Sequence, residues 1–433
     1  MSRRSPIYQP TRRALLGSAA ALGGAALLGR PARAGGISPV DRKFIFIFNI
    51  GGWDPTRVFS DGFDHTIVDM ESSAERASAA GLSYITHPNR PQIDAFFSQY
   101  ASRIAIIDGM LVPSIAHEAC FQLVLTGGAS DSASDWPSIL GLAEKSRYTA
   151  PNLVLGGPSF PGPSREAVVQ SGVGGQLADL LSGDYRSWSA ESNGEVLSLP
   201  SRQVLDRYLR QRASAYLESA PEGRAFEQAA AFQNALSRAS GLEADAREID
   251  FSSIHNLGDA TGVAVAALSS GISRCVMLCE PVSGERGFDS HTTNDDLQNV
   301  LFGDLFTYLQ SLIFGLEAQD GEFGGSLLDE TCVVVFSEMG RTPWLNTGGG
   351  KDHWPYTSVM LIGSGVRGGV NIGGYDADWI GETIDPETGD PDEDGEPITC
   401  QGLGATLLAM GGVDWTEHCP DSGPIPALTT DTI

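Results

Sequence analysis

Six short, nearly continuous apolar runs restrict the possible folds of this 433-residue chain more than any other feature. Strands that are buried on both faces have such runs, because side chains on each face meet a covering layer. Helix-like segments lie between the runs, which is typical of a sheet with helices on both sides. We therefore predict an α/β fold, a three-layer α/β/α sandwich with a parallel or mixed sheet. The runs are residues 43–50, 103–108, 152–156, 274–280, 331–337 and 358–363.

Four segments have the apolar spacing of helices. In the segment that begins at residue 294, leucines recur every three or four residues, so one face of this helix should pack on the sheet. Residues 160–255 are rich in Ser, Ala, Glu and Arg and contain no convincing strand, which predicts a mainly helical insertion. The other three helical segments are 199–217, 222–239 and 256–271.

Residues 385–397 (DPETGDPDEDGEP) form an acidic loop by composition. Asp390, Asp392, Asp394 and Gly395 resemble the start of a calcium-binding loop, but Gln401 stands at the twelfth position, where a bidentate Glu is expected. We expect a solvated acidic loop, with a calcium site as the alternative.

Residues 1–34 have the pattern of a twin-arginine signal peptide, with the pair Arg12 and Arg13 and an A-x-A ending at Ala34. The weakly apolar stretch 14–29 is shorter than the roughly 20 residues of a membrane span, although a single anchor is the alternative. We predict recognition by the twin-arginine export machinery and a mature domain in residues 35–433. That domain would be periplasmic or extracellular, with no stable membrane span after cleavage.

The charge of the chain excludes one class of partner. Removal of residues 1–34 removes six arginines, so 28 − 6 = 22 basic residues face 54 acidic ones, a net charge of 22 − 54 = −32. Such a surface repels nucleic acid. The six cysteines form no C-x-x-C pair, which argues against a thiolate metal site, and Cys400 and Cys419 are candidates for a disulfide.

Acidic and imidazole side chains border four of the apolar runs. Ligands of open α/β sheets bind beyond the carboxyl ends of the strands, so these side chains should gather at one edge. Carboxylates and imidazoles gathered there need a cation, and oxygen and nitrogen ligands without thiolate suit Zn, Mn, Mg or Ca. Of these divalent metals we expect Zn or Mn first, with Ca as a further option. The predicted ligands are Asp54, Asp289, His291, Glu338, Asp352 and His353.

Each of these residues also has a structural interpretation. Asp289 with His291 can be the N-terminal cap of the following helix. Asp352 with His353 can form a salt bridge in a turn. A lone Asp after a strand is usually a turn or cap residue, which applies to Asp54. Arg341 follows Glu338 closely and can simply neutralise it.

A serine nucleophile of the α/β-hydrolase type needs G-x-S-x-G, and that pentapeptide is absent from the sequence.

Five motifs between residues 43 and 374 carry a family resemblance. They are, in order, GGWD, SIAHEACFQLVLTGG, GFDSH, SEMGRTP and GGGKDHWPYTSVMLIGSGVRGG. In these motifs the chain resembles the exported bacterial family labelled domain of unknown function 1501, which is related to the alkaline phosphatase and sulfatase superfamily. The resemblance implies an α/β/α sandwich with a two-metal site that hydrolyses phosphate or sulfate esters through a Ser or Thr nucleophile.

Carried over by position, the resemblance implies five ligands and changes two other places. The five ligands are Asp54, Asp289, His291, Glu338 and His353. Met339 stands where the superfamily usually has a histidine ligand, and His117 stands where its nucleophile is expected. His117 is therefore a ligand, a general base or nucleophile, or a helix-start residue without a chemical role, and we favour ligand or base. Ser114 is a nearby hydroxyl, and Arg341 would bind the anionic group of the substrate.

These residues predict an exported metal-dependent hydrolase of phosphate or sulfate esters, with a small-molecule or polymer-borne anionic ester as substrate. The alternative is a non-catalytic metal- or ligand-binding envelope protein that retains the fold. Catalysis would depend on His117 and Arg341.

Overall fold

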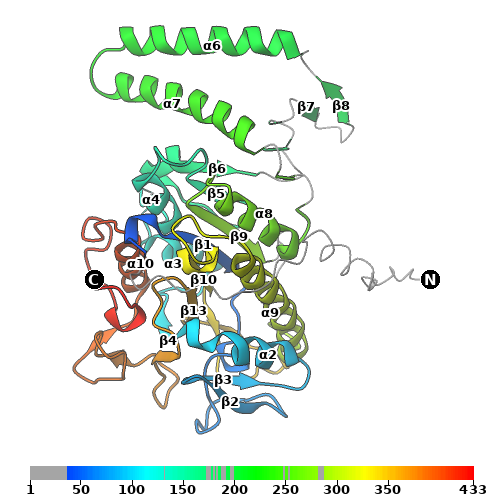
Figure 1. Ribbon diagram of the computed structural model, residues 1–433. Helices are drawn as coiled ribbons and strands as arrows, with labels where there is room; N and C mark the ends of the chain where they lie inside the picture. Colours follow the sequence, from blue (N-terminus) through cyan, green and yellow to red (C-terminus); the bar gives the residue numbers. More distant parts are fainter. Residues whose placement is uncertain are drawn as a thin grey trace. The chain divides into compact units, whose positions relative to one another are not determined.

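The six apolar runs form strands of one mixed sheet, as predicted (Figure 1). The computed structural model describes residues 37–130, 132–171, 177–178, 181, 184–186, 192–195, 199–246, 249–251, 254–280 and 287–433. The predicted export signal in residues 1–34 lies outside the described residues. The strands of the sheet are β1 (Lys43–Asn49), β4 (Ile104–Leu111), β5 (Asn152–Val154), β6 (Val168–Gln170), β9 (Cys275–Glu280), β10 (Thr331–Ser337), β13 (Tyr356–Gly363) and β14 (Val370–Gly373).

The strand order is β14-β4-β13-β10-β1-β9-β5-β6. Strand β1 lies between β10 and β9 and is parallel to both. Strand β13 runs antiparallel to its neighbours β10 and β4, whereas the other pairs in this sheet are parallel. The carboxyl ends of β1, β9, β10 and β4 therefore lie at one edge, where β13 begins.

Helices cover both faces of the sheet and complete the α/β/α sandwich (Figure 1). Residues of β1 alternate between two cores: Ile45 and Ile47 pack with α2, α8 and α9, while Phe44, Phe46 and Phe48 pack with α3, α4 and α10. This alternation follows from the two-residue repeat of a strand. The helices are α2 (Pro91–Tyr100), α3 (His117–Thr126), α4 (Trp136–Ala143), α6 (Leu199–Ser219), α7 (Arg224–Asp245), α8 (Leu257–Ser269), α9 (Asn294–Ala318) and α10 (Cys400–Met410).

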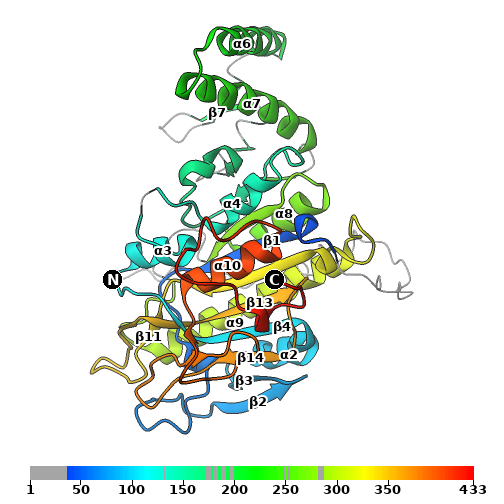
Figure 2. The same cartoon turned by 90° about the vertical axis from the view of Figure 1, so that its left-hand side faces the viewer.

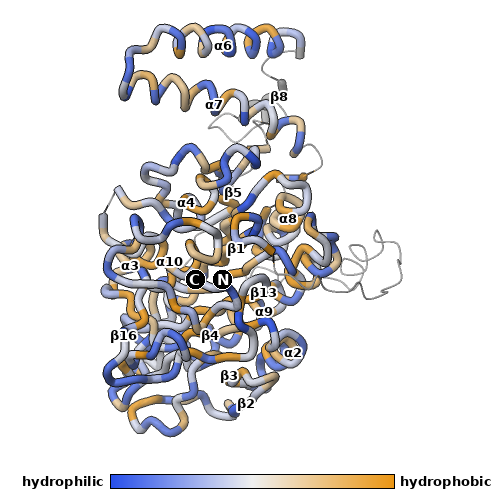
Figure 3. The backbone as a smooth tube through the Cα atoms, turned by 60° about the vertical axis from the view of Figure 1, so that its left-hand side comes forward, coloured by the Kyte–Doolittle hydropathy of each residue, from blue (hydrophilic) through white to orange (hydrophobic). Residues whose placement is uncertain are grey.

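The region 160–255 contains two of the predicted helices, α6 and α7, and also strands that the sequence analysis did not predict. Helices α6 and α7 lie where they are expected, and Figure 3 shows hydrophilic stretches along α6 and hydrophobic ones around β1. Strand β6 also lies there and pairs with β5 at the edge of the main sheet. Three residues are too few for a periodic pattern, and β6 forms because β5 offers a parallel partner. A separate pair, β7 (Asp184–Arg186) and β8 (Ser192–Glu195), is antiparallel.

Three small antiparallel pairs complete the described strands. The acidic loop 385–397 lies around one of them, and its residues Asp390, Asp392 and Asp394 are exposed, as expected of a solvated loop. Among the described residues, no group of three or more metal-ligating side chains gathers at this loop. The pairs are β2 (Glu75–Ala79) with β3 (Leu82–Thr86), β11 (Gly340–Arg341) with β12 (His353–Trp354), and β15 (Thr383–Ile384) with β16 (Glu396–Pro397).

Helix α9 is the one helix within the described ranges that is long and apolar enough to cross a membrane. Its buried residues include Phe302, Phe306 and Leu309, which pack in the core under the sheet, and the polar residues Asn294 and Gln298 are buried with them. Length and composition do not separate a core helix from a span, and these contacts are those of a core helix.

The six cysteines are all buried free thiols. The disulfide between Cys400 and Cys419 that the spacing allowed is therefore not formed. Both thiols belong to the core beside α10, where each behaves as a small apolar side chain.

Asp108 is a buried carboxylate near the end of β4, and no cation pairs with it within the described part of the chain. Its Oδ1 accepts hydrogen bonds from Ser60 and Ser358, at 2.5 and 2.8 Å. Burial raises the pKa of Asp108 to about 6, although these hydroxyls act in the opposite direction. An acid with a raised pKa holds its proton more tightly in the folded state, so stability falls as pH rises from about 4 to about 6.

We expect Asp108→Asn to remove this pH dependence. The variant and the wild type should have similar free energies of unfolding near pH 4, and the variant should be more stable by up to about 3 kcal/mol above pH 6, since two pKa units correspond to that energy. Urea denaturation at several pH values measures the difference. A difference that does not change between pH 4 and pH 7 would contradict the assignment.

Candidate metal centre

Two glycines after β1 begin the site. Gly51 and Gly52 have positive φ values of 111° and 74°, which residues other than Gly rarely adopt. A Cβ on Gly52 would also lie 2.7 Å from the Met339 side chain. The turn lets the Gly51 N–H donate to Glu338 Oε1 at 2.8 Å and directs the carbonyls of both glycines to Arg341. The GGWD motif thus shapes the backbone around Glu338 and Arg341.

Glu338 is fully buried directly after β10 and orients His117. Its Oε1 accepts a hydrogen bond from His117 Nδ1 at 2.7 Å, and Ser337 Oγ lies 3.0 Å from its Oε2. His117 is the first residue of α3, which enters the site from the segment after β4. Figure 2 shows α3 and β11 at the same end of the sheet. The oxygens of Glu338 thus accept from three partners, and its role as a ligand stays a prediction.

The β11–β12 pair brings His353 to the site. Arg341 and His353 are direct partners in its register. His353 Nδ1 donates to the carbonyl of Ile115 at 2.7 Å, which directs the other ring nitrogen inward. His291 is oriented in the same way, since its Nδ1 lies 3.0 Å from Asp352 Oδ1. Gly350 permits the close approach of this loop, because a Cβ there would lie 2.0 Å from the His291 backbone.

The Nε2 atoms of the three histidines converge on Asp289. Asp289 Oδ1 lies 3.1 Å from the Nε2 of His291, 3.5 Å from that of His353 and 3.8 Å from that of His117. The Nε2 atoms of His291 and His353 are 3.0 Å apart. Tetrahedral Zn²⁺ with ligands at about 2.05 Å separates those ligands by about 3.4 Å, and these four separations lie close to that value. Within the described ranges, the ligand atoms of His117, Asp289 and His353 also all lie within 4.8 Å of one another.

The hydrogen bonds indicate which nitrogen of each histidine ring carries no proton. Each Nδ1 faces an acceptor, namely a carboxylate for His117 and His291 and a carbonyl for His353. In the neutral rings the proton therefore lies on Nδ1, and Nε2 presents a lone pair to the other two rings and to Asp289. This arrangement is that of metal-ligating histidines, whose second nitrogen donates to a carboxylate or carbonyl.

Charge favours a divalent cation at the same point. The carboxylates of Asp289, Glu338 and Asp352 carry three negative charges and Arg341 carries one positive charge, so the cluster has a net charge of −3 + 1 = −2 with neutral rings. The hydrogen bond to Glu338 raises the pKa of His117, whereas burial lowers the pKa of His353. Burial raises the pKa of Asp289, but the hydrogen bond and charge of Arg341 lower it by more. The pKa of Asp289 is therefore below its usual value, and its carboxylate stays ionised.

Arg341 differs from the predicted role. Its guanidinium is fully buried and donates to the carbonyls of Gly51, Gly52 and Lys351 and to Asp289 Oδ1, the last at 2.8 Å. A buried guanidinium with four acceptors is not exposed to bind a substrate anion. Arg341 is instead a positioning residue that holds Asp289.

Asp54 also lies outside the histidine cluster. Its Oδ2 is 2.9 Å from Lys351 Nζ and 3.5 Å from Arg57 Nε, and its Oδ1 accepts from Thr56. Burial alone would raise the pKa of Asp54, but these two cations hold it well below its usual range. Lys351 thus supplies the positive charge that the sequence analysis assigned to a metal at Asp54.

Two further residues from the sequence analysis do not enter the cluster. Met339 is buried in the hydrophobic core beside α3 and α10. Ser114 Oγ accepts from the N–H of Ala116 at 3.2 Å, in the turn before α3. The roles of Lys351 and of Ile115 were missed, since a lysine in a glycine-rich loop and a backbone carbonyl carry no specific sequence signal.

The fold and this cluster define an α/β/α protein with a His/Asp centre at the carboxyl edge of its sheet. Residues 92–420 match the model of the family described as "Protein of unknown function (DUF1501)", and the chain belongs to that family. No curated protein is a significant match to the chain.

Several solved structures are similar to the chain at low identity. A protein in complex with its substrate D-glucosamine-2-N,6-O-disulfate has 12% identity and a TM-score of 0.38, over 90% of this chain and 80% of that chain. A protein in the alkaline phosphatase superfamily from Vibrio parahaemolyticus has 11% identity and a TM-score of 0.35, over 86% and 67%. The phosphonate monoester hydrolase of Agrobacterium radiobacter has 12% identity and a TM-score of 0.33, over 90% and 78%.

We expect Lys351→Met to destabilise the protein by about 3–5 kcal/mol, because it removes one of the two cations from the buried Asp54 carboxylate. Urea denaturation measures the change. Lys145→Met is the control, since Lys145 pairs with Glu166 at the surface and should matter little. The double variant Asp54→Asn/Lys351→Met should recover part of the loss, and a Lys351→Met protein as stable as the wild type would contradict the role of this pair.

Proposed function

We propose that this protein is an exported metal-dependent hydrolase of phosphate or sulfate esters. The observation that supports it is the convergence of three imidazole Nε2 atoms on Asp289 Oδ1, with each Nδ1 bound to an acceptor. Export is inferred from the twin-arginine pattern in residues 1–34, and it implies a periplasmic or extracellular location.

In this proposal His117, Asp289 and His353 hold one divalent cation, Zn²⁺ or Mn²⁺. Nitrogen and carboxylate oxygen ligands suit both ions, and the charge of −2 on the cluster matches either one. The bound cation supplies Lewis acidity toward an ester oxygen and lowers the pKa of a water molecule. Three protein ligands leave one coordination position open, as catalytic sites require.

His291 is the proposed general base. Its side chain is 46% exposed, against 26% for His117 and 19% for His353, so it is the most accessible ring of the three. Asp352 accepts from its Nδ1 and stabilises the protonated ring. His291 Nε2 takes the proton of the attacking water as the water oxygen bonds to phosphorus or sulfur. The bond from phosphorus or sulfur to the ester oxygen then breaks, and His291 returns the proton to the departing alkoxide.

A second candidate is a non-catalytic metal-binding envelope protein. His291 Nε2 lies 3.1 Å from Asp289 Oδ1 and 3.0 Å from His353 Nε2, and these separations also suit a fourth ligand. Four protein ligands would close the shell, as in structural metal sites. The two candidates therefore differ in the role of a single side chain.

We expect Glu338→Gln to lower the affinity for Zn²⁺ by about 10- to 100-fold, because the variant loses the carboxylate that orients His117. Competition with a chelator, followed by elemental analysis of the purified protein, measures this affinity. Glu393→Gln is the control, since Glu393 is an exposed acid of the 385–397 loop. Equal affinities in wild type and Glu338→Gln would reject the metal site.

We expect His291→Ala to keep the bound metal and to lose about 10²- to 10⁴-fold in turnover of an aryl phosphate or aryl sulfate, the range that general base catalysis contributes. His255→Ala is the control, since His255 is exposed outside the cluster. Loss of the metal from His291→Ala would identify His291 as the fourth ligand and favour the binding protein. A wild type that holds the metal but hydrolyses neither ester with any divalent metal would reject the hydrolase.

A further inference from the structure

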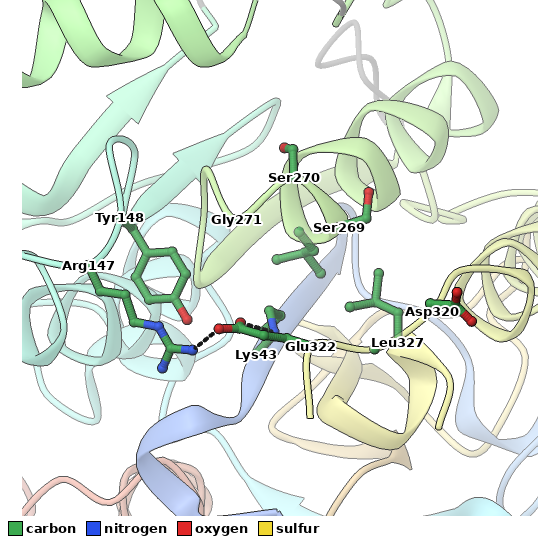
Figure 4. A pocket seen from close by; sticks show the side chains of 11 residues that line it. Lys43, Arg147, Tyr148, Ser269, Ser270, Gly271, Asp320, Glu322 and Leu327 are labelled. Atoms are coloured by element: carbon green, nitrogen blue, oxygen red, sulfur yellow. Dashed lines mark hydrogen bonds and ion pairs between the residues drawn. The ribbon is translucent and has the colours of Figure 1, made fainter. Parts of the chain in front are cut away.

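A cavity lies at the opposite end of β1 from the histidine cluster. It has a volume of about 380 Å³, and Lys43, the first residue of β1, forms part of its wall (Figure 4). Seven residues of strand separate the two places, which corresponds to about 20 Å. The volume is within the range of small-molecule sites.

Three hydrogen-bond donors face this cavity. Arg147 and Tyr148 come from the segment after α4, and Lys43 comes from β1. Tyr148 is 3% exposed, and its hydroxyl has no hydrogen-bond partner among the described residues. Buried polar groups are nearly always hydrogen-bonded, so this hydroxyl indicates a missing acceptor. Burial raises the pKa of Tyr148 to about 12, so the hydroxyl keeps the proton that it would donate.

The Glu322 carboxylate already sits between the two cations. Glu322 Oε1 lies 2.8 Å from Arg147 Nη2, and its Oε2 lies 3.5 Å from Lys43 Nζ. Figure 4 shows this carboxylate between the two side chains, with the carboxylate of Asp320 pointing away from the pair. Half of the Glu322 side chain, 51%, is exposed, so the side chain can leave without opening the core.

Each cation retains a stronger partner when Glu322 leaves. Lys43 is 2.9 Å from the buried Glu330, and Arg147 is 2.6 Å from Asp41. The Arg147 guanidinium also lies over the rings of Tyr148 and Phe323, at 5.5 and 5.3 Å. These contacts keep both donors in place, so the Glu322 carboxylate is the exchangeable member of the group.

We propose that this cavity binds a small carboxylate-bearing molecule, whose carboxylate replaces that of Glu322 between Arg147 and Lys43 and whose chain carries a hydroxyl oxygen that accepts a hydrogen bond from Tyr148. Leu268 and Leu327 form an apolar part of the wall, and Ser269 and Ser270 add hydroxyl oxygens from the end of α8. The body of the ligand is therefore a short chain that carries hydroxyl groups. This site does not depend on the proposed hydrolase activity.

Isothermal titration of the purified full chain with gluconate tests the proposal. Sorbitol is the neutral probe of similar size. We expect gluconate to bind more tightly than sorbitol, Glu322→Ala to bind gluconate about tenfold more tightly than wild type, and Tyr148→Phe to bind it about tenfold more weakly, because Tyr148→Phe removes the buried donor to the ligand hydroxyl. Glu243→Ala, which removes an equal charge from the Arg202 pair on α6 and α7, should leave the affinity unchanged.

Three results would overturn the proposal. The first is equal binding of sorbitol and gluconate, because the charge would then be irrelevant. The second is an affinity of Glu322→Ala for gluconate no higher than that of the wild type, and the third is no effect of Tyr148→Phe on it. Metal content, measured on the same samples, should be equal in all variants, so a failure here is separate from a failure of the histidine site.

Discussion

The parallel pairing of β1 with β10 is the constraint on which the site depends. Its register places Asn49 opposite Ser337, so the next residues of both strands leave the sheet at the same edge. The Gly51 N–H then meets the Glu338 carboxylate, and Glu338 in turn holds His117. A buried carboxylate is costly without such partners, so the pairing, the glycine turn and the imidazole contact stabilise one another.

Charge is distributed over two separate groups at this edge. Asp54 is neutralised by Lys351 and Arg57 within the protein, whereas the cluster around Asp289 has more negative than positive charge and three imidazole lone pairs. The first group is neutralised by its own cations, whereas the second keeps a net negative charge. This difference, rather than the presence of acids after strands, separates a structural ion pair from a candidate metal centre.

Much of the fold was predictable from local pattern. The runs that became β1, β9 and β10 are apolar on both faces because helices cover both, and the leucine spacing of α9 reflects its contact with the sheet. Strand β6 was not predictable, since it depends on a partner and not on its own three residues. In the site, the sequence analysis grouped Asp289 with the histidines. It did not predict that Arg341 is buried, because the acceptors of Arg341 include backbone carbonyls that are distant in sequence.

The sequence by itself determined the α/β class, the positions of most strands and the residue types available for chemistry, because these follow from hydrophobic periodicity and from composition. Only the tertiary structure decided which charges meet. Lys351, next to Asp352 in the chain, pairs with Asp54, while Asp352 pairs with His291. Neighbours in sequence thus belong to different electrostatic groups, because the Lys351 side chain enters the buried interior while Asp352 stays exposed at the surface.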